Sequence, residues 1–301
     1  MSYRINEMFK RVLGQDIAGR DFTIYPDDTF IVSYPRSGNT WTRFLIANLL
    51  FPEQDVSFAS IENQVPDAEA QSRIHLRRVA RPRFIKSHEY FHPRYRKVVY
   101  IVRDPRDVAL SYYDFQRKYG QLEDTYPLAS YVSDFVSGRL ISADWGTWRE
   151  NVGSWISARS GSPDFLLLRY EDMIEDTVRQ ISRLSQFLGV KPTSTLLDRA
   201  IEKSAAGHMR ELEKKQSAQW VSTRGKRDDI PFVRTAISGG WKTKLPENLV
   251  SEIEAAWGPM MSALGYELVT YRERDSREVA AVRSSLNLQT LVLPKVAPEQ
   301  Q

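Results

Sequence analysis

The chain has 301 residues, of which 42% are hydrophobic and 27% are charged, with a net charge of +4. This composition is that of a globular protein, and the length is sufficient for one α/β domain or two small ones. No apolar run is long enough for a membrane-spanning helix, and the N-terminus lacks the apolar core of a signal peptide. The absence of Cys excludes disulfides and thiolate nucleophiles. We therefore expect a cytoplasmic protein with no membrane span.

The positive charge is concentrated in one part of the chain. Residues 73–106 contain eleven basic side chains and two acidic ones, so the remainder of the chain is net negative. Such a stretch is typical of a solvated surface, but it also fits a nucleic-acid patch or a site for a small anion. The motifs below are needed to choose between these interpretations.

The predicted elements alternate along the chain. Short runs rich in β-branched and aromatic residues predict buried strands at 29–34, 83–87, 97–102 and 164–169. Helical patterns predict helices at 40–51 and 174–188, and another that begins after Asp104-Pro105 as N-cap and first helical residue. This alternation predicts an α/β fold with a central, mostly parallel sheet flanked by helices.

No linker divides the predicted elements into two groups. We therefore expect one domain over residues 1–270, followed by a tail or arm at 271–301 that either packs on the body or on a partner or is disordered. Residues 52–82, 117–147 and 205–240 are expected to be connections or lids, since long loops are more often functional than idle.

The first strand runs directly into the segment SYPRSGNTW, Ser33 to Trp41. Pro35 and Gly38 fit a tight turn, and a helix that begins here directs its backbone N–H groups and positive dipole end at one spot. Further donors come from the side chains of Arg36, Ser37, Asn39 and Thr40. The segment predicts a P-loop-like phosphate-binding turn, although the G-x-x-x-x-G-K-[ST] spacing of a true P-loop is absent.

The same segment carries a family resemblance. YPRSGNTW resembles the 5′-phosphosulfate loop of sulfotransferases that use 3′-phosphoadenosine 5′-phosphosulfate (PAPS), with Arg36 where the common family form has Lys. The resemblance implies PAPS as the co-substrate, adenosine 3′,5′-bisphosphate (PAP) as the product, and no metal. The residues of the turn that would bind the co-substrate are Arg36, Ser37, Gly38, Asn39, Thr40 and Trp41.

Three later segments extend the resemblance in the family's order. YIVRDPRDVALSYYDF, residues 100–115, resembles the 3′-phosphate segment, which assigns Arg103 and Ser111 to that phosphate. LLRYEDM, residues 167–173, resembles a segment whose Tyr lies near the adenine, here Tyr170, with Trp41 packing nearby. FVRTAISGGWK, residues 232–242, resembles the C-terminal co-substrate motif through Arg234, although Thr235 and Ala236 replace the usual Lys-Gly. These departures suggest a bacterial-type member of the family.

The resemblance also implies the chemistry. FIKSHEYF, residues 84–91, matches the segment that provides the catalytic base and a Lys on the sulfuryl group, here His88 and Lys86. His suits proton removal near neutral pH. We expect direct in-line transfer in which Arg36 stabilises the departing phosphate, Ser111 anchors the 3′-phosphate, and Arg234 closes over it.

Other functions remain open at this point. His88-Glu89-x-x-His92 matches the zinc-peptidase signature, but this signature requires a helix, and Pro93 follows at once. A P-loop-like phosphotransferase would need a Lys and a magnesium ligand set that we do not find. A protein that binds PAPS without catalysis would not need both His88 and Lys86. We expect no nucleic-acid partner.

The acceptor is the least defined part of the sequence. The resemblance allows a small molecule, or a hydroxyl or amine of a sugar or peptide, and the sequence leaves open whether the chain forms a homodimer. The aromatic residues that are candidates for the acceptor pocket are Phe58, Tyr90, Phe91, Tyr112, Tyr113 and Trp220.

Overall fold

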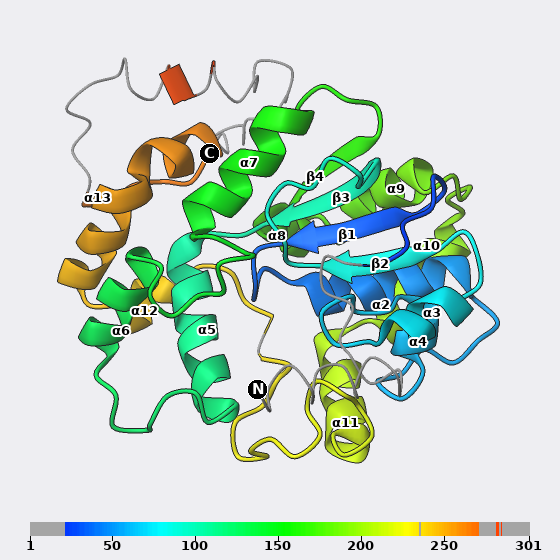
Figure 1. The fold of residues 1–301 in the computed structure, drawn as a ribbon, viewed down its shortest axis with the longest axis horizontal. Coiled ribbons are helices and arrows are strands. Elements are labelled where there is room, and N and C mark those ends of the chain that lie inside the picture. Colours follow the sequence, from blue (N-terminus) through cyan, green and yellow to red (C-terminus); the bar gives the residue numbers. More distant parts are fainter. Residues whose placement is uncertain (1–21, 235, 271–280, 283, 285–301) are drawn as a thin grey trace, which may run out of the picture.

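The computed structural model describes residues 22–234 and 236–270, together with 281, 282 and 284 (Figure 1). At its centre is a four-stranded sheet in which neighbouring strands run parallel, in the order β2-β1-β3-β4. The strands are β1 (Thr29–Ser33), β2 (Phe84–Ser87), β3 (Lys97–Val102) and β4 (Phe165–Arg169). The sequence prediction of a single α/β domain with a parallel sheet is confirmed, and each strand lies within one residue of its predicted bounds.

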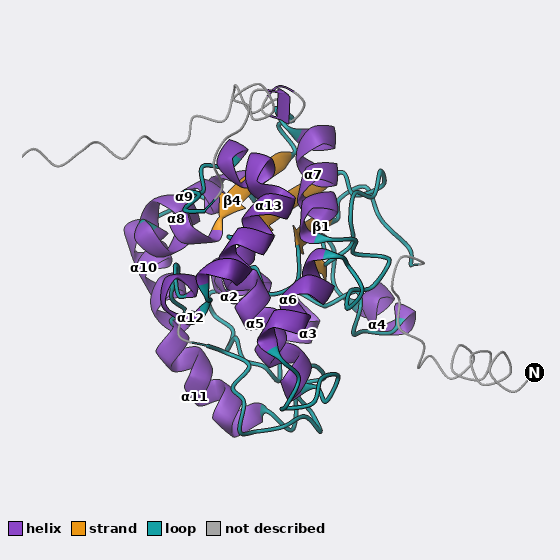
Figure 2. Ribbon diagram, turned by 90° about the vertical axis from the view of Figure 1, so that its left-hand side faces the viewer, coloured by secondary structure: helices purple, strands orange, loops and turns teal. Residues whose placement is uncertain are grey.

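Both faces of the sheet are buried, because alternate residues of each strand enter different cores. Phe30 and Val32 of β1 face one core, whereas Ile31 between them faces the other. The first core is completed by helices α5 (Pro105–Lys118), α6 (Leu128–Val136), α7 (Trp148–Arg159) and α13 (Glu247–Ala263). The second is completed by α2 (Asn39–Leu50), α9 (Thr177–Phe187), α10 (Ser194–Lys203) and α11 (Ala206–Gln216). Figure 2 shows the strands enclosed between helices.

Helix α5 begins as the sequence predicts. The Asp104 side chain accepts a hydrogen bond from the backbone N–H of Arg106, and Pro105 occupies the first helical position. Asp at this position satisfies a backbone donor that has no partner within the helix. The start of α5 is therefore fixed directly after β3.

The predicted helix at 174–188 is in fact two helices, α8 (Tyr170–Glu175) and α9. Asp176 separates them, because its backbone leaves the helical region and its side chain caps α9 by accepting from the N–H of Arg179. The predicted connections also contain helices that the sequence did not indicate. The connection 52–82 contains α3 (Ile61–Gln64) and α4 (Arg73–Arg78), 117–147 contains α6, and 205–240 contains α11, whereas α12 (Trp241–Lys244) follows the last connection.

Within the described part of the chain, no helix is both long and apolar enough to cross a membrane. The predicted tail at 271–301 lies outside the described residues, apart from 281, 282 and 284.

Candidate active site

A cavity of about 1150 Å³ opens at the carboxyl ends of the four strands. The connection after β1 leads to β2 on one side, and the connection after β3 leads to β4 on the other. In parallel α/β sheets, this reversal between neighbouring strands leaves a crevice in which ligands bind. All the predicted site residues line the cavity except Ser37, which is fully buried within the turn and donates its N–H to the Tyr34 carbonyl.

The turn after β1 has the shape of an anion-binding loop. Arg36 and Gly38 both have positive φ angles, 67° and 96°, so the chain reverses sharply before α2 begins at Asn39. Asn39 braces the turn from below, since its Nδ2 donates to the Ile31 carbonyl and to Ser33 Oγ. The first backbone N–H groups of a helix have no partner within it. In α2 these groups belong to the residues that line the cavity beside the turn, where an anion can accept from them.

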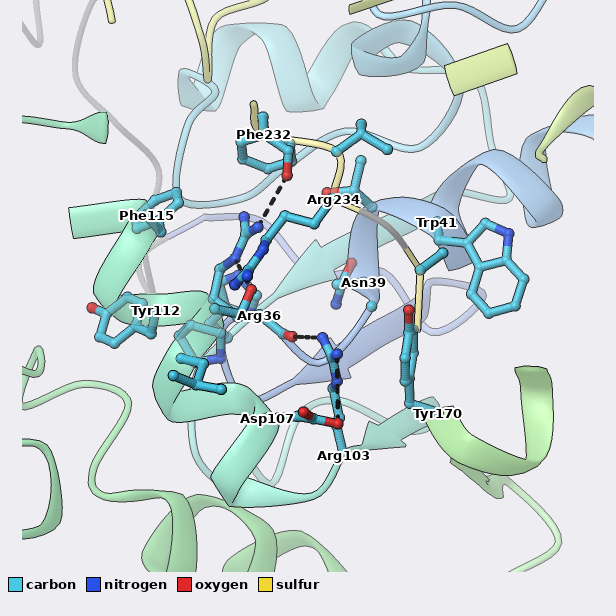
Figure 3. Close-up of a pocket in the computed structure, with 18 of the residues that line it drawn as sticks. Arg36, Asn39, Trp41, Arg103, Asp107, Tyr112, Phe115, Tyr170, Phe232 and Arg234 are labelled. Carbon is cyan, nitrogen blue, oxygen red and sulfur yellow. Dashed lines mark hydrogen bonds and ion pairs between the residues drawn. The ribbon is translucent and has the colours of Figure 1, made fainter. Parts of the chain in front are cut away.

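The Arg36 guanidinium connects the turn to two distant segments (Figure 3). Its Nε donates to Ser111 Oγ of α5 at 3.1 Å, and its Nη2 donates to the Phe232 carbonyl at 3.0 Å. The group also lies 5.1 Å from the ring centre of Phe115 and 4.7 Å from that of Phe232. Burial lowers the pKa of Arg36 to about 10, so it stays charged at neutral pH.

Arg103 lies at the end of β3, beside the turn. It donates to the Arg36 carbonyl at 3.1 Å and to the Ile237 carbonyl at 3.2 Å, and its guanidinium stacks 4.2 Å from the ring centre of Tyr170. Asp107 Oδ2 is 3.9 Å away. A planar guanidinium held on both sides in this way presents its N–H groups in a fixed direction, as phosphate binding requires.

Asp107 is a structural residue of the site that the sequence analysis did not identify. Its two carboxylate oxygens accept from the backbone N–H groups of Gly239 and Trp241, at 2.7 and 2.9 Å. This ties the C-terminal segment to the first turn of α5. Arg234, from the same segment, forms an ion pair with Asp114 at 3.0 Å. Asp107 lies inside the segment 100–115 already quoted, but nothing in its spacing indicated contacts 132 and 134 residues away.

Tyr170 and Trp41 form the aromatic end of the cavity, as Figure 3 shows. Their ring centres are 5.8 Å apart and the rings are nearly perpendicular, at 76°. Tyr170 begins α8 at the end of β4, and Trp41 lies in the first turn of α2. Tyr170 is buried and Trp41 is half-buried, and both line the cavity, so the pair offers an apolar surface to a planar ring.

His88 lies after β2, at the opposite end of the cavity. Its Nδ1 is 2.7 Å from the Ser33 carbonyl, which can only accept, so Nδ1 carries the proton and Nε2 has the free lone pair. Asn151 holds the backbone by donating to the His88 carbonyl at 2.9 Å. Burial, aided by the charge of Lys86, lowers the pKa of His88 to about 3. The imidazole is therefore neutral at neutral pH, with the Nε2 lone pair unprotonated.

Lys86 is also in the cavity wall, but it has partners that the sequence did not indicate. Its Nζ lies 2.9 Å from Asp67 Oδ2 and 2.5 Å from Glu69 Oε2. Burial opposes the charged ammonium, but the two carboxylates outweigh this effect and raise the pKa of Lys86. The acids belong to the connection 52–82, where polar residues are normally solvated, so the sequence offered no signal for this cluster.

The zinc-peptidase interpretation fails on geometry. Residues 88–92 are not helical, so the two His do not share a helix face. His92 instead stacks on Tyr95 with ring centres 4.6 Å apart, whereas His88 faces Ser33. Among the residues that the structure describes, no group of three or more acidic or His side chains is arranged to hold a metal ion.

The part of the cavity beyond His88 is mainly apolar and aromatic. Trp145 meets the His88 ring edge to face, with centres 5.7 Å apart. Of the six aromatic candidates from the sequence, Tyr112 and Trp220 line the cavity, and the other four do not. Further lining side chains come from α5 and from the connection before α7, namely Leu110, Phe115, Tyr119, Leu140 and Ile141.

Comparison with known proteins gives the family. The model of the sulfotransferase domain family matches residues 26–265. Mouse Sulfotransferase 1E1 is 29% identical over 244 residues, covering 76% of this chain and 81% of that protein. The 3-beta-hydroxysteroid sulfotransferase of Cavia porcellus is 28% identical over 265 residues, covering 84% and 90%.

A solved structure has the same fold. Retinol dehydratase, in complex with androsterone and the inactive cofactor PAP, superposes with a TM-score of 0.66 at 22% identity, covering 85% of each chain. Because the family model spans most of the chain and the fold agrees, the chain belongs to the sulfotransferase domain family.

Proposed function

We propose that this sulfotransferase moves the sulfuryl group of PAPS to the hydroxyl of a small acceptor, with His88 as the base that takes the acceptor's proton. The observation that carries the proposal is the order of groups along the sheet edge. In space, the strand ends present first Lys86 and His88, then the turn at Arg36, then Arg103, and finally Tyr170.

This order matches the order of chemical groups in PAPS. The sulfuryl group is attached to the 5′-phosphate, which is followed by the ribose with its 3′-phosphate and then by the adenine. Three strand spacings cover roughly 14 Å, which is comparable to the span of such a molecule from sulfur to base. A base and a cation at one end, two anion sites in the middle and an aromatic pair at the other end therefore suit one extended nucleotide.

The proposed step is a single in-line displacement. His88 Nε2 takes the proton of the acceptor hydroxyl while its oxygen forms a bond to sulfur, and the bond between sulfur and the 5′-phosphate oxygen breaks. Lys86 contacts the sulfuryl oxygens, while Arg36 and the N–H groups of the turn stabilise the charge on the departing phosphate. Arg103, Ser111 and Arg234 hold the 3′-phosphate, which fixes the sulfur relative to His88.

The acceptor proposed here is a small hydrophobic molecule with a hydroxyl. The region beyond His88 is lined by aromatic and aliphatic side chains, including Tyr112 and Trp145, which favours an apolar acceptor over a sugar. Relatives and neighbours are named for such compounds, as in the steroid sulfotransferase and the androsterone complex described above.

Three further predictions from the sequence stay predictions. They are a cytoplasmic location, the domain boundary at residue 270 and a homodimer.

The donor is tested by binding and the acceptor by turnover. PAP at a hundred times its dissociation constant should stabilise the folded protein by about 2.7 kcal/mol, visible as a rise in melting temperature. Labelled PAPS offered with hydrophobic alcohols and phenols, and separately with sugars and peptides, should label the first group. Absence of any thermal shift with PAP would overturn the proposed donor, and labelling confined to sugars would overturn the proposed acceptor.

A further inference from the structure

A short extended segment lies against the outer edge of β2 and carries two acids into the cavity wall. Lys86 donates its N–H to the Pro66 carbonyl at 2.8 Å, and its own carbonyl accepts from Ala68 at 3.0 Å. Asp67 pairs with Lys86 as an isolated parallel bridge. These backbone contacts fix Asp67 and Glu69 beside the residues proposed for catalysis.

Glu69 contacts three successive residues at the end of β2. Its Oε2 accepts from Lys86 Nζ at 2.5 Å. Its Oε1 accepts from Ser87 Oγ at 3.1 Å and from the backbone N–H of His88 at 2.5 Å. One carboxylate therefore holds the side chain of the proposed sulfuryl-binding cation and the backbone of the proposed base.

We propose that Glu69 is the positioning residue of the reaction, which holds Lys86 and His88 in register with each other at the end of β2. The proposal rests on the proposed function, because it assigns a role relative to the same transferred group. An ammonium has three N–H donors. Asp67 and Glu69 each accept one, which leaves the third donor of Lys86 for a sulfuryl oxygen without breaking either contact.

Asp67 has a narrower role in this cluster. Its Oδ2 contacts Lys86, and its Oδ1 accepts from the backbone N–H of Glu69 at 2.9 Å, whereas its charge acts on His88 without a hydrogen bond between them. Its own N–H donates to Glu62, which is paired with Arg43 of α2. Asp67 thus orients Glu69, whereas Glu69 accepts hydrogen bonds from both Lys86 and His88.

The charges around Glu69 make its role dependent on pH. It faces Asp67 on its own segment and Lys86 and His88 on and after β2, with Arg43 of α2 behind Asp67. Burial, together with the neighbouring Asp67, raises the pKa of Glu69 to about 7 against the opposing effect of Lys86. Protonation of Glu69 removes the negative charge that pairs with Lys86 and turns one of its acceptor oxygens into a donor, which weakens its hold on Lys86 and His88.

The test is the substitution Glu69→Gln, which keeps the size but replaces one acceptor oxygen by a donor. We expect kcat to fall about 10- to 100-fold, because small displacements of reacting groups have effects of that order. The dissociation constant for PAP should change less than threefold. We expect kcat of the wild type to rise through pH about 7 as Glu69 loses its proton, and this rise should be absent in Glu69→Gln, since the pKa of His88 is far lower.

Two further variants control the experiment. Glu69→Asp keeps the charge, but its shorter side chain cannot reach the three donors on Lys86, Ser87 and His88 together. Its kcat should lie between those of the wild type and Glu69→Gln, and the rise of kcat through pH about 7 should be retained. Glu175→Gln, at an exposed carboxylate of α8, should match the wild type. A Glu69→Gln enzyme with kcat within twofold of wild type, or with PAP binding lost in parallel with kcat, would overturn the positioning role. If the wild type itself bound no PAP, the proposed function would fail instead.

Discussion

Gly38 lies directly against the ring of Tyr170. A methyl group placed on Gly38 would come within 2.5 Å of Tyr170 Cδ2 and 2.9 Å of Cε2, so no other residue fits there without moving the ring. The Gly38 φ angle of 96° also disfavours any side chain. The phosphate-binding turn and the proposed adenine site are thus in contact through a glycine.

Gly38→Ala is expected to weaken PAP binding more than tenfold, because the displaced Tyr170 ring also stacks on Arg103. Gly120→Ala is the matched control, since Gly120 has a φ angle of 68° but open space around its Cα. Both variants incur a backbone cost of about 1–2 kcal/mol, whereas only the first displaces a ring. Calorimetric titration with PAP measures the difference. Normal PAP affinity in Gly38→Ala would exclude Tyr170 from the nucleotide site.

His88→Ala is expected to lower kcat by about 10²- to 10⁴-fold, the usual contribution of a positioned base. PAP binding should change little, because the one contact of the ring with the turn segment is to the Ser33 carbonyl, and a carbonyl is not a donor to phosphate. His208→Ala, at an exposed His of α11, is the control. Steady-state turnover and PAP titration are measured on both proteins. A His88→Ala enzyme with near-normal turnover would mean that another group takes the proton.

Asp107→Ala is expected to loosen the C-terminal segment, because the N–H groups of Gly239 and Trp241 lose their shared acceptor. The free energy of unfolding should fall by about 1–3 kcal/mol. PAP affinity should fall about tenfold, because Arg103 also contacts this segment through the Ile237 carbonyl. Urea unfolding and PAP titration are the measurements. The exposed Asp198 of α10 provides a control substitution. Unchanged PAP affinity would show that nucleotide binding does not depend on this tether.

Glu171 should make stability depend on pH. Burial raises the pKa of Glu171 to about 7, although the Asp104 N–H donates to it. The folded state then binds more protons than the unfolded state between pH 4.5 and 7. The contribution of protonated Glu171 to the free energy of unfolding is fully present below pH 4.5 and is lost as pH rises through 7. Relative to Glu171→Gln, the wild type should lose on the order of 2 kcal/mol between pH 5 and 8, measured by urea unfolding. If the free energies of unfolding of the two proteins changed with pH in the same way, the raised pKa of Glu171 would be contradicted.

The sheet and the co-substrate side of the site were largely predictable from the sequence. The strands are short apolar runs, and the Asp104-Pro105 pair specifies a helix start through local chemistry alone. Arg103 and Tyr170 were assigned to the site by the family resemblance of their segments, and both follow strands of the parallel sheet and line the cavity. These features depend on patterns within a few residues of one another.

The partners of the charged groups were not predictable. Glu69 reaches Lys86 from a connection seventeen residues earlier, and Arg36 reaches Phe232 across 196 residues. Such contacts depend on how the connections pack against the sheet. The sequence around a carboxylate in a loop does not indicate whether that carboxylate is buried. The sequence identified most of the co-substrate residues that line the cavity, but it missed Asp67, Glu69 and Asp107 and did not show what holds each group.

In the proposed complex, each strand end holds a different chemical group of PAPS. This arrangement has a consequence for how such enzymes diversify. The residues proposed to contact the nucleotide follow β1, β3 and β4, while the proposed acceptor space is lined mostly by α5 and the segment 139–145. Mutations can accumulate in those walls without disturbing the phosphate contacts. A single donor chemistry can thus be inherited unchanged while descendants drift towards new acceptors, and laboratory selection for a new acceptor should yield substitutions at positions such as Leu140 and Ile141.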